Sequence, residues 1–271
     1  MAYDALHSAK TDIGLRRQQN EDHYLADPAL RLYVVCDGMG GGNAGEIASG
    51  MAIDAIREFL RAPLGREETA WSRDPNISAA TTQLAAAIRE ANHTIHRASW
   101  SHPSYAGMGT TVVAARLTDK LLSIAHVGDS RLYLIRNGRI ELLTADHSWV
   151  AEQVQQGLMT EAEAERSPKR NIVTRALGVE SSVEVDIGEM PVLPGDRLLL
   201  CSDGLTRGVR PSEILRTIES VPDADIAAER LIAMANAAGG EDNTTVLLIT
   251  IESGKAESLW QRIQDWFPKA S

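Results

Sequence analysis

The sequence of 271 residues has only two cysteines, Cys36 and Cys201, and no uninterrupted apolar run near the ~20 residues that a membrane-spanning helix needs. Residues 1–10 also lack the apolar core of a signal peptide. We interpret both cysteines as small buried hydrophobes in a reducing compartment. A redox-sensitive pair is the second hypothesis. These features predict a cytoplasmic protein without a transmembrane segment.

Positive charge is also scarce, because 27 Lys and Arg against 37 Asp and Glu give a net charge of −10. A general nucleic-acid binder needs a basic face, so the charge argues against that class. Hydrophobic residues make up 44% of the chain, which is enough for a packed core. Without an internal repeat or a long linker, we expect one domain over residues 1–252 and an amphipathic tail over residues 253–271. The tail is expected to dock on the body, with contact to a partner or a membrane surface as the alternative.

The period of the apolar residues changes along the chain. Helical spacing predicts helices over residues 45–61, 77–99, 211–219 and 224–238, with Ser78 as a cap of the second. Short apolar runs predict strands over residues 3–8, 32–36, 111–116, 121–127, 131–136, 140–143, 183–188, 196–201 and 245–251. Turns at Thr118-Asp119 and Asn137-Gly138 join the central strands into an antiparallel meander. This order predicts an α+β sandwich of layers, in which helices cover the outer faces of antiparallel sheets.

Two polar segments interrupt this pattern. Residues 63–76 contain proline and are predicted to form a loop between the first two helices. Residues 149–170 are rich in Glu and Gln and are interpreted as a surface helix and flap.

Acidic residues stand at strand ends or in turns along nearly the whole chain. They occur in the motifs Asn20-Glu21-Asp22, Cys36-Asp37-Gly38, Gly128-Asp129-Ser130, Ser202-Asp203-Gly204 and Glu241-Asp242-Asn243. The second, third and fourth motifs follow apolar runs, so their carboxylates should lie at the rims of sheets. Several such rims brought together form a cluster of negative charge that is costly unless a cation fills it. Carboxylate oxygens suit Mg²⁺ or Mn²⁺, so the sequence predicts a hydrolytic metal centre.

A glycine-rich segment follows Asp37 and allows two interpretations. Residues 40–45 match the pattern GxGxxG between a strand and a helix, which is typical of dinucleotide sites. The antiparallel meander and the polar loop after the helix argue against that interpretation. No Gly-Lys-Ser/Thr closes the segment, so it is not a P-loop. We favour a structural role, in which the glycines let the backbone pass close to the metals and expose a carbonyl.

Eight short motifs occur along the chain in the order that is typical of one enzyme family. They are residues 14–22, 35–41, 109–111, 126–131, 146–148, 174–178, 202–205 and 241–244. In this combination the chain resembles the metal-dependent serine/threonine protein phosphatases of the 2C type, in their bacterial form. The resemblance spans roughly residues 8–251. It implies a sandwich of two antiparallel sheets flanked by helix pairs, and hydrolysis of phosphoserine and phosphothreonine on proteins at a site with two Mn²⁺ or Mg²⁺ ions.

The resemblance also implies roles for individual residues. Asp37 would bridge the two metals, and the Gly38 carbonyl would bind one of them. Asp203 and Asp242 would hold the other ion. Arg17 occupies the position of the phosphate-binding arginine of the family, where the planar guanidinium matches phosphate oxygens.

Other positions follow the family less directly. Asp22 and Glu21 would act through metal-bound water, and Asp129 resembles the site of a third, weaker metal shared with Asp203. Animal members have a His two positions after the bridging Asp as a candidate general acid, whereas this chain has Met39. The leaving-group acid therefore stays open, with a metal-bound water as the expected substitute.

The leading hypothesis is an active phosphatase that opposes a bacterial serine/threonine kinase and acts as a monomer on phosphorylated proteins. A phosphatase-like module that binds phosphoproteins without turnover is the alternative from another class. A regulatory phosphatase of sigma-factor control would carry extra sensor domains. Structural roles are expected for His126 and His147, a turn for Asp146, and ion pairs with acids for Arg131 and Arg175.

Overall fold

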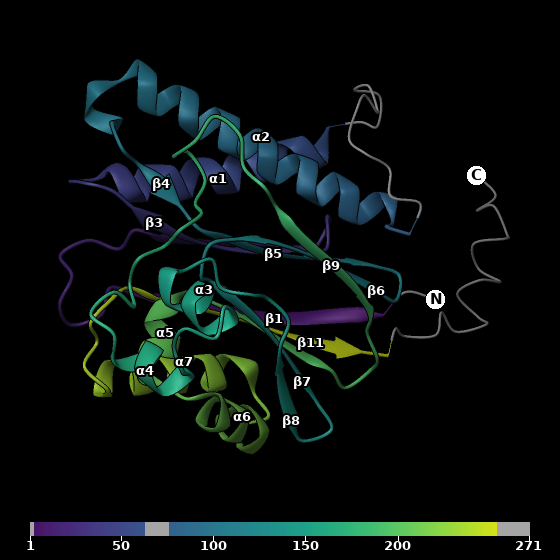
Figure 1. The fold of residues 1–271 in the computed structure, drawn as a ribbon. Helices are drawn as coiled ribbons and strands as arrows, with labels where there is room; N and C mark the ends of the chain where they lie inside the picture. The colour runs from purple at the N-terminus through teal and green to yellow at the C-terminus, as the bar shows by residue number, and fades with distance from the viewer. Residues whose placement is uncertain (1–2, 63–75, 254–271) are drawn as a thin grey trace, which may run out of the picture.

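Two antiparallel sheets lie face to face between two layers of helices in the computed structural model, which describes residues 3–62 and 76–253 (Figure 1). The order of the first sheet is β1-β11-β10-β7-β8. Its strands are β1 (Asp4–Asp12), β11 (Thr244–Glu252), β10 (Arg197–Cys201), β7 (Arg131–Arg136) and β8 (Arg139–Leu142). The order of the second sheet is β2-β3-β5-β6-β9, and β4 pairs with β3. Its strands are β2 (Asp22–Asp27), β3 (Leu32–Met39), β5 (Val112–Thr118), β6 (Leu121–Val127), β9 (Asp186–Pro191) and β4 (Gly109–Thr110).

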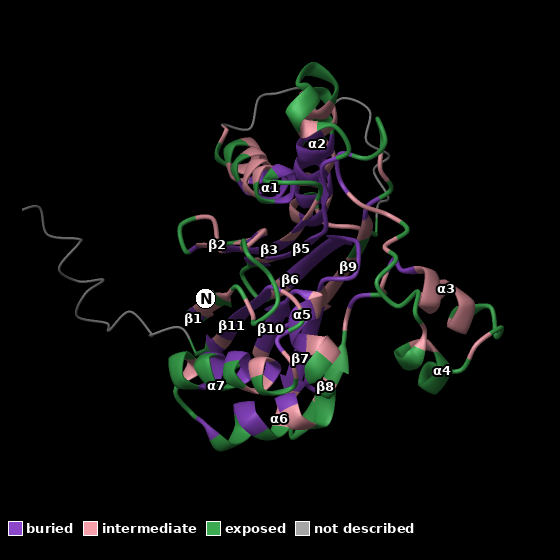
Figure 2. Cartoon of the chain, turned by 90° about the vertical axis from the view of Figure 1, so that its left-hand side faces the viewer, coloured by how far each residue is buried: buried purple, intermediate pink, exposed green. Residues whose placement is uncertain are grey.

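The helices cover the outer faces of these sheets, as Figure 1 shows. The long helices α1 (Ala44–Arg61) and α2 (Ala79–Ser101) pack on the second sheet, and a short 3-10 helix, η1 (Pro103–Tyr105), follows them. The other layer consists of α5 (Asp203–Gly208), α6 (Pro211–Ser220) and α7 (Ala224–Ala237). The short helices α3 (Trp149–Gln155) and α4 (Glu161–Arg166) form neither layer, and they project to one side with half-buried and exposed residues (Figure 2).

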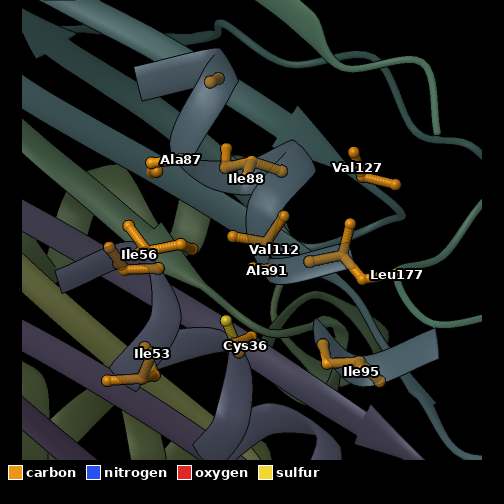
Figure 3. Packing of buried hydrophobic residues seen from close by; sticks show 14 of the residues in the cluster. Cys36, Ile53, Ile56, Ala87, Ile88, Ala91, Ile95, Val112, Val127 and Leu177 are labelled. Carbon is orange, nitrogen blue, oxygen red and sulfur yellow. The ribbon is translucent and has the colours of Figure 1, made fainter. Parts of the chain in front are cut away.

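The apolar side chains form one core between the sheets and one core under each helical layer. Strand β3 shows why its apolar run is continuous. Tyr33 and Val35 point into the core between the sheets, whereas Val34 and Cys36 point toward α1 and α2. Figure 3 shows Cys36 and Ile53 of α1 among the side chains of this outer core. Both faces of the strand are therefore removed from water, which stabilises the fold by about 1.5–3 kcal/mol for each large aliphatic side chain.

The predicted layered α+β fold is confirmed, and most predicted elements have nearly the expected bounds. Ser78 caps α2 by accepting a hydrogen bond from the Thr81 N–H, as predicted. The two predicted turns contain Asp119 and Asn137 with φ near +52°, a conformation that Asp and Asn tolerate better than most residues. The loop after α1 falls on residues 63–75 and the tail on residues 254–271, both of which lie outside the described residues.

Three local predictions differ from the structure. Strand β2 was missed, because an edge strand that pairs on one side only, with β3, tolerates the mixed polarity of residues 22–27. Helix α5 was missed because it has only six residues, which is too short for a visible period. The segment 149–170 contains two short helices instead of one. Among the residues that the structure describes, none of the helices has the length and apolarity needed to cross a bilayer.

The two cysteines lie in different layers. Cys36 belongs to the core under α1 and α2, whereas Cys201 belongs to the core under α5, α6 and α7. Both thiols are free and buried, and burial raises the pKa of both, for Cys201 to about 12. Thiolates are the reactive form of cysteine, so these positions favour the interpretation as buried hydrophobes over a redox-sensitive pair.

Candidate metal centre

Two of the predicted acidic residues face each other across neighbouring strands. Asp22 begins β2 and lies opposite Asp37 of β3 in the antiparallel register. Asp203 comes from the other sheet, because it begins α5 directly after β10. The Ser202 hydroxyl donates a hydrogen bond of 2.7 Å to Asp22 Oδ2 and so links the two sheets at this point. The sandwich therefore brings carboxylates from both sheets to one end of the molecule.

The remaining acidic motif residues lie in loops that hydrogen bonds hold near these strands. The Asn243 amide donates to the Ile13 and Gln19 carbonyls, both at 2.9 Å, and its Oδ1 accepts from the Glu21 N–H at 2.8 Å. This amide fixes the loop that carries Asp242 against the segment that leads into β2. Asp129 follows β6 and is only 6% exposed.

Electrostatic interactions show that the five aspartates form one cluster. Burial raises the pKa of Asp37 well above its ordinary value, and the charges of the other members raise it further. These members are Asp22, Asp203, Asp129 and Asp242. Burial is also the main cause of the raised pKa values of Asp22, Asp129 and Asp203. Glu21 lies at the edge of the cluster, where burial raises its pKa as well.

Three carboxylate oxygens of the cluster are buried and have no hydrogen-bond donor among the described residues. Within the described part of the chain, Glu21 Oε1, Asp22 Oδ1 and Asp203 Oδ1 are buried and accept no hydrogen bond. A buried acceptor without a partner costs about 1–3 kcal/mol, and more if it is charged. Divalent cations such as Mn²⁺ and Mg²⁺ bind such oxygens. The residues present therefore fit a metal centre.

The glycine-rich segment after Asp37 has a steric role. A Cβ atom on Gly38 would lie 2.1 Å from the Gly45 carbonyl oxygen, and one on Gly45 would lie 2.5 Å from Glu21 Oε1. The start of α1 thus packs directly on the residues of the acidic cluster. The dinucleotide hypothesis is wrong, because β3 pairs antiparallel with both β2 and β5, whereas a dinucleotide site needs a parallel sheet.

Two arginines neutralise part of the cluster. Arg17 donates to both oxygens of Asp242, from Nε at 2.7 Å and from a terminal nitrogen at 2.8 Å. Arg207, which the sequence analysis missed, donates to Asp203 Oδ2 and, at 2.8 Å, to Asp242 Oδ2. The available signal was its place four residues after Asp203, because residues at this spacing face each other on a helix.

The histidines support the turn that carries Asp129. The Gly128 N–H donates to His147 Nδ1 at 3.0 Å, and His126 stacks on His147 with ring centroids 4.9 Å apart. His126, His147 and Asp186 could in principle hold a metal ion. However, the Arg175 guanidinium lies 2.5 Å from Asp186 and 3.1 Å from His147, so a cation already contacts two of these three residues.

The expected ion pairs of the other residues are present. Arg131 donates to both oxygens of Asp146 at 2.6–3.1 Å. Arg175 pairs with Asp186. These ion pairs give Arg131, Asp146 and Arg175 structural roles, so no catalytic role is needed to explain them.

We expect the metal-free protein to become more stable as the pH falls from about 7.5 to about 5.5. Burial raises the pKa of Asp22 from 3.8 to about 7, so between these values the folded protein binds more protons than the unfolded chain. The contribution of Asp22 to the free energy of unfolding is therefore greatest below pH 3.8. This contribution is lost as the pH rises toward 7. Thermal melts in EDTA across this range measure the effect.

Two comparisons isolate the cause of this pH dependence. Asp22→Asn should lose part of the slope, which a general effect of net charge would not do. Saturating Mn²⁺ should reverse the trend, because the cation replaces the protons. A pH slope in Asp22→Asn equal to that of the wild type would contradict the placement of Asp22 in the carboxylate cluster.

Comparisons with known proteins agree with this geometry. The sequence pattern of the family described as protein phosphatase 2C matches residues 15–247. The chain is 40% identical over 243 residues to the serine/threonine phosphatase stp of Listeria monocytogenes, and the match covers 89% of this chain and 93% of that protein.

Solved structures are similar over nearly the whole fold. The Mycobacterium tuberculosis serine/threonine phosphatase PstP/Ppp has a TM-score of 0.81 at 35% identity, and the match covers 92% of this chain and 99% of that chain. A structure of the PstP catalytic domain contains two manganese ions and has a TM-score of 0.79 at 34% identity, with the same coverage of the two chains.

Proposed function

The chain belongs to the protein phosphatase 2C family, and we propose that its carboxylate cluster is the metal centre of this activity. The protein is a metal-dependent serine/threonine protein phosphatase, which removes phosphate from phosphoserine and phosphothreonine on proteins. Its cofactors are Mn²⁺ or Mg²⁺ ions. The observation that carries the assignment of the site is the set of three buried carboxylate oxygens that accept no hydrogen bond within the described residues.

We assign the ligands from their places in the cluster. Asp37 would contact both ions, because the charges of the other four aspartates act on it. The Gly38 carbonyl would bind one of the ions, and Asp203 with Asp242 would hold the other. A third ion would lie between Asp129 and Asp203, since the charge of Asp203 is the main electrostatic influence on the pKa of Asp129.

Asp22 and Glu21 supply the outer contacts of this centre. Each has one buried oxygen that accepts no hydrogen bond from the described residues, so each oxygen can orient a water at an ion. Two divalent cations held by these residues would lower the pKa of a water and stabilise the charge of an in-line displacement at phosphorus.

The other residues of the site bind and orient the substrate. Arg17 offers a planar fork for two phosphate oxygens, and with 49% of its side chain exposed it can exchange Asp242 for phosphate. Met39 ends β3, where animal members of the family have a His. A thioether has no proton to donate, so this side chain does not protonate the leaving oxygen.

Arg17→Ala should raise KM for a phosphopeptide about tenfold or more and change kcat less, since the arginine binds phosphate in the ground state. Steady-state kinetics at saturating Mn²⁺ measure both constants. Arg16→Ala is the matched control, because Arg16 is the adjacent exposed arginine. An unchanged KM in the Arg17 variant would contradict the assignment of phosphate binding.

Release of phosphate from phosphoserine, phosphothreonine and phosphotyrosine peptides tests the function directly. We expect turnover of the first two with Mn²⁺ and none in EDTA. A protein that binds these peptides in Mn²⁺ but releases no phosphate would instead be a phosphoprotein-binding module. The buried oxygens without partners argue against that alternative, because binding alone does not need a dimetal centre.

We also propose a cellular setting. The substrates must be phosphorylated by a serine/threonine kinase, which the enzyme would oppose. One chain contributes the whole acidic cluster, so a monomer is sufficient for activity. The cytoplasmic location stays a prediction from the sequence features given above. The division into a catalytic domain and a tail at residue 253 also stays a prediction.

A further inference from the structure

Arg207 places a resident positive charge between two of the proposed metal ligands. Helix α5 puts it one turn after Asp203, and its guanidinium donates to Asp203 Oδ2 and, at 2.8 Å, to Asp242 Oδ2. Only 19% of the Arg207 side chain is exposed, so these carboxylates, more than water, neutralise its charge. The two carboxylates assigned to the same ion thus share one arginine.

The hydrogen bonds of Asp203 and Asp242 show which of their oxygens a cation could bind beside Arg207. Asp203 keeps its other oxygen, Oδ1, without a partner among the described residues, so that oxygen is open to an ion. Both oxygens of Asp242 accept from Arg17, and Oδ2 also accepts from Arg207. A cation that binds Asp242 must therefore replace an arginine contact. Arg17 can turn to solvent or phosphate, whereas the largely buried Arg207 stays beside the ion.

We propose that Arg207 is a built-in counter-ion of the Asp203–Asp242 pair, and that it lowers the affinity of this part of the centre for divalent cations. The inference rests on the proposed function, because it assumes that these aspartates bind metal. A positive charge beside a dication repels it, and this repulsion is strong at a site with little water. In the metal-free protein the same charge relieves the repulsion between the two carboxylates. Arg207 thus stabilises the metal-free state and weakens metal binding.

Arg207 lines a small cavity beside the proposed ligands. The cavity has a volume of about 150 Å³ and lies between α5, the end of α7 and the loop of Asp242. Arg207 lines it together with the small residues Gly204, Gly208 and Ala235. Arg170 lines the same cavity, but it pairs with Glu241 at 2.8 Å and not with a proposed ligand. Arg170 is therefore a control that has the same charge and the same cavity without the contact to the aspartates.

Calorimetric titration of Mn²⁺ into the metal-free full-length chain tests the proposal, together with thermal melts in EDTA. Arg207→Gln should bind the Mn²⁺ ion that depends on Asp242 about tenfold more tightly than the wild type, and it should melt at a lower temperature in EDTA. Arg170→Gln should leave the Mn²⁺ affinity unchanged. Arg207→Lys keeps the charge and should stay within about threefold of the wild type.

The possible outcomes separate this inference from the proposed function. Unchanged or weaker Mn²⁺ binding by Arg207→Gln would overturn the inference, even if the variant is less stable, because a purely structural arginine gives that result. Tighter binding by Arg207→Lys, equal to that of Arg207→Gln, would also overturn it. Asp203→Asn that binds Mn²⁺ like the wild type would instead overturn the proposed metal centre. If Arg207→Gln does not fold without metal, Arg207→Met keeps the apolar stem and permits the same titration.

Discussion

Asp37→Asn should reduce Mn²⁺-dependent phosphate release by about 10³-fold or more, since metal-ion stabilisation of the transition state is worth several kcal/mol. Asp37 is half-buried, and the charges of four other aspartates act on it. Asparagine keeps the shape of the side chain but loses the charge that a second cation needs. The loss of repulsion should also make the metal-free variant more stable than the wild type. Phosphate release, circular dichroism and melts in EDTA measure these effects together.

Asp119→Asn is the matched control for this substitution. Asp119 is an exposed turn residue with φ of +52°, a conformation that asparagine also adopts readily. We expect wild-type turnover and stability from it. Turnover that persists in Asp37→Asn, with Asp119→Asn as the reference, would refute the central place of Asp37 in the metal centre.

Gly38→Ala should destabilise the protein by about 3 kcal/mol and remove its activity, because overpacking of this kind displaces backbone. The added Cβ would lie 2.1 Å from the Gly45 carbonyl oxygen and 2.7 Å from the Glu21 carbonyl oxygen. Both atoms belong to the backbone, so neither can rotate away. The start of α1 or the segment before β2 must then move, and the acidic cluster moves with it. Urea denaturation of the metal-free protein measures the free energy of unfolding.

Gly41→Ala provides the control in the same glycine-rich segment. Among the described residues, nothing lies within 4 Å of the position that its Cβ would take, and its φ is not in the left-handed region. We expect stability and activity close to the wild type. Equal stability of Gly38→Ala and Gly41→Ala would contradict the close packing of α1 on the acidic cluster.

Local patterns predicted those parts of the fold in which each element carries its own signal. The buried strand β6 has the predicted bounds Leu121–Val127, because a continuous apolar run between polar turns identifies it. The helices α1 and α2 follow from apolar spacing and, for α2, from the Ser78 cap. The edge strand β2 and the six-residue helix α5 carry no such signal, and only their contacts in the folded protein stabilise them.

The site was predictable to a similar degree. The aspartates that follow buried strands could be found from sequence, because the end of a strand fixes where the next residue lies. The contact between Ser202 and Asp22 joins residues 180 positions apart, and no local pattern contains it. The spacing of four from Asp203 was a local signal for Arg207, but its contact with Asp242, in a loop 35 residues later, has no local pattern.

Crystals grown with Mn²⁺ and measured at the manganese absorption edge test the central claim most directly. The account predicts two strong anomalous peaks, one beside Asp37 and the Gly38 carbonyl and one among Asp37, Asp203 and Asp242. A fully manganese-loaded crystal without anomalous density at these carboxylates would contradict it, whatever the activity of the protein in solution.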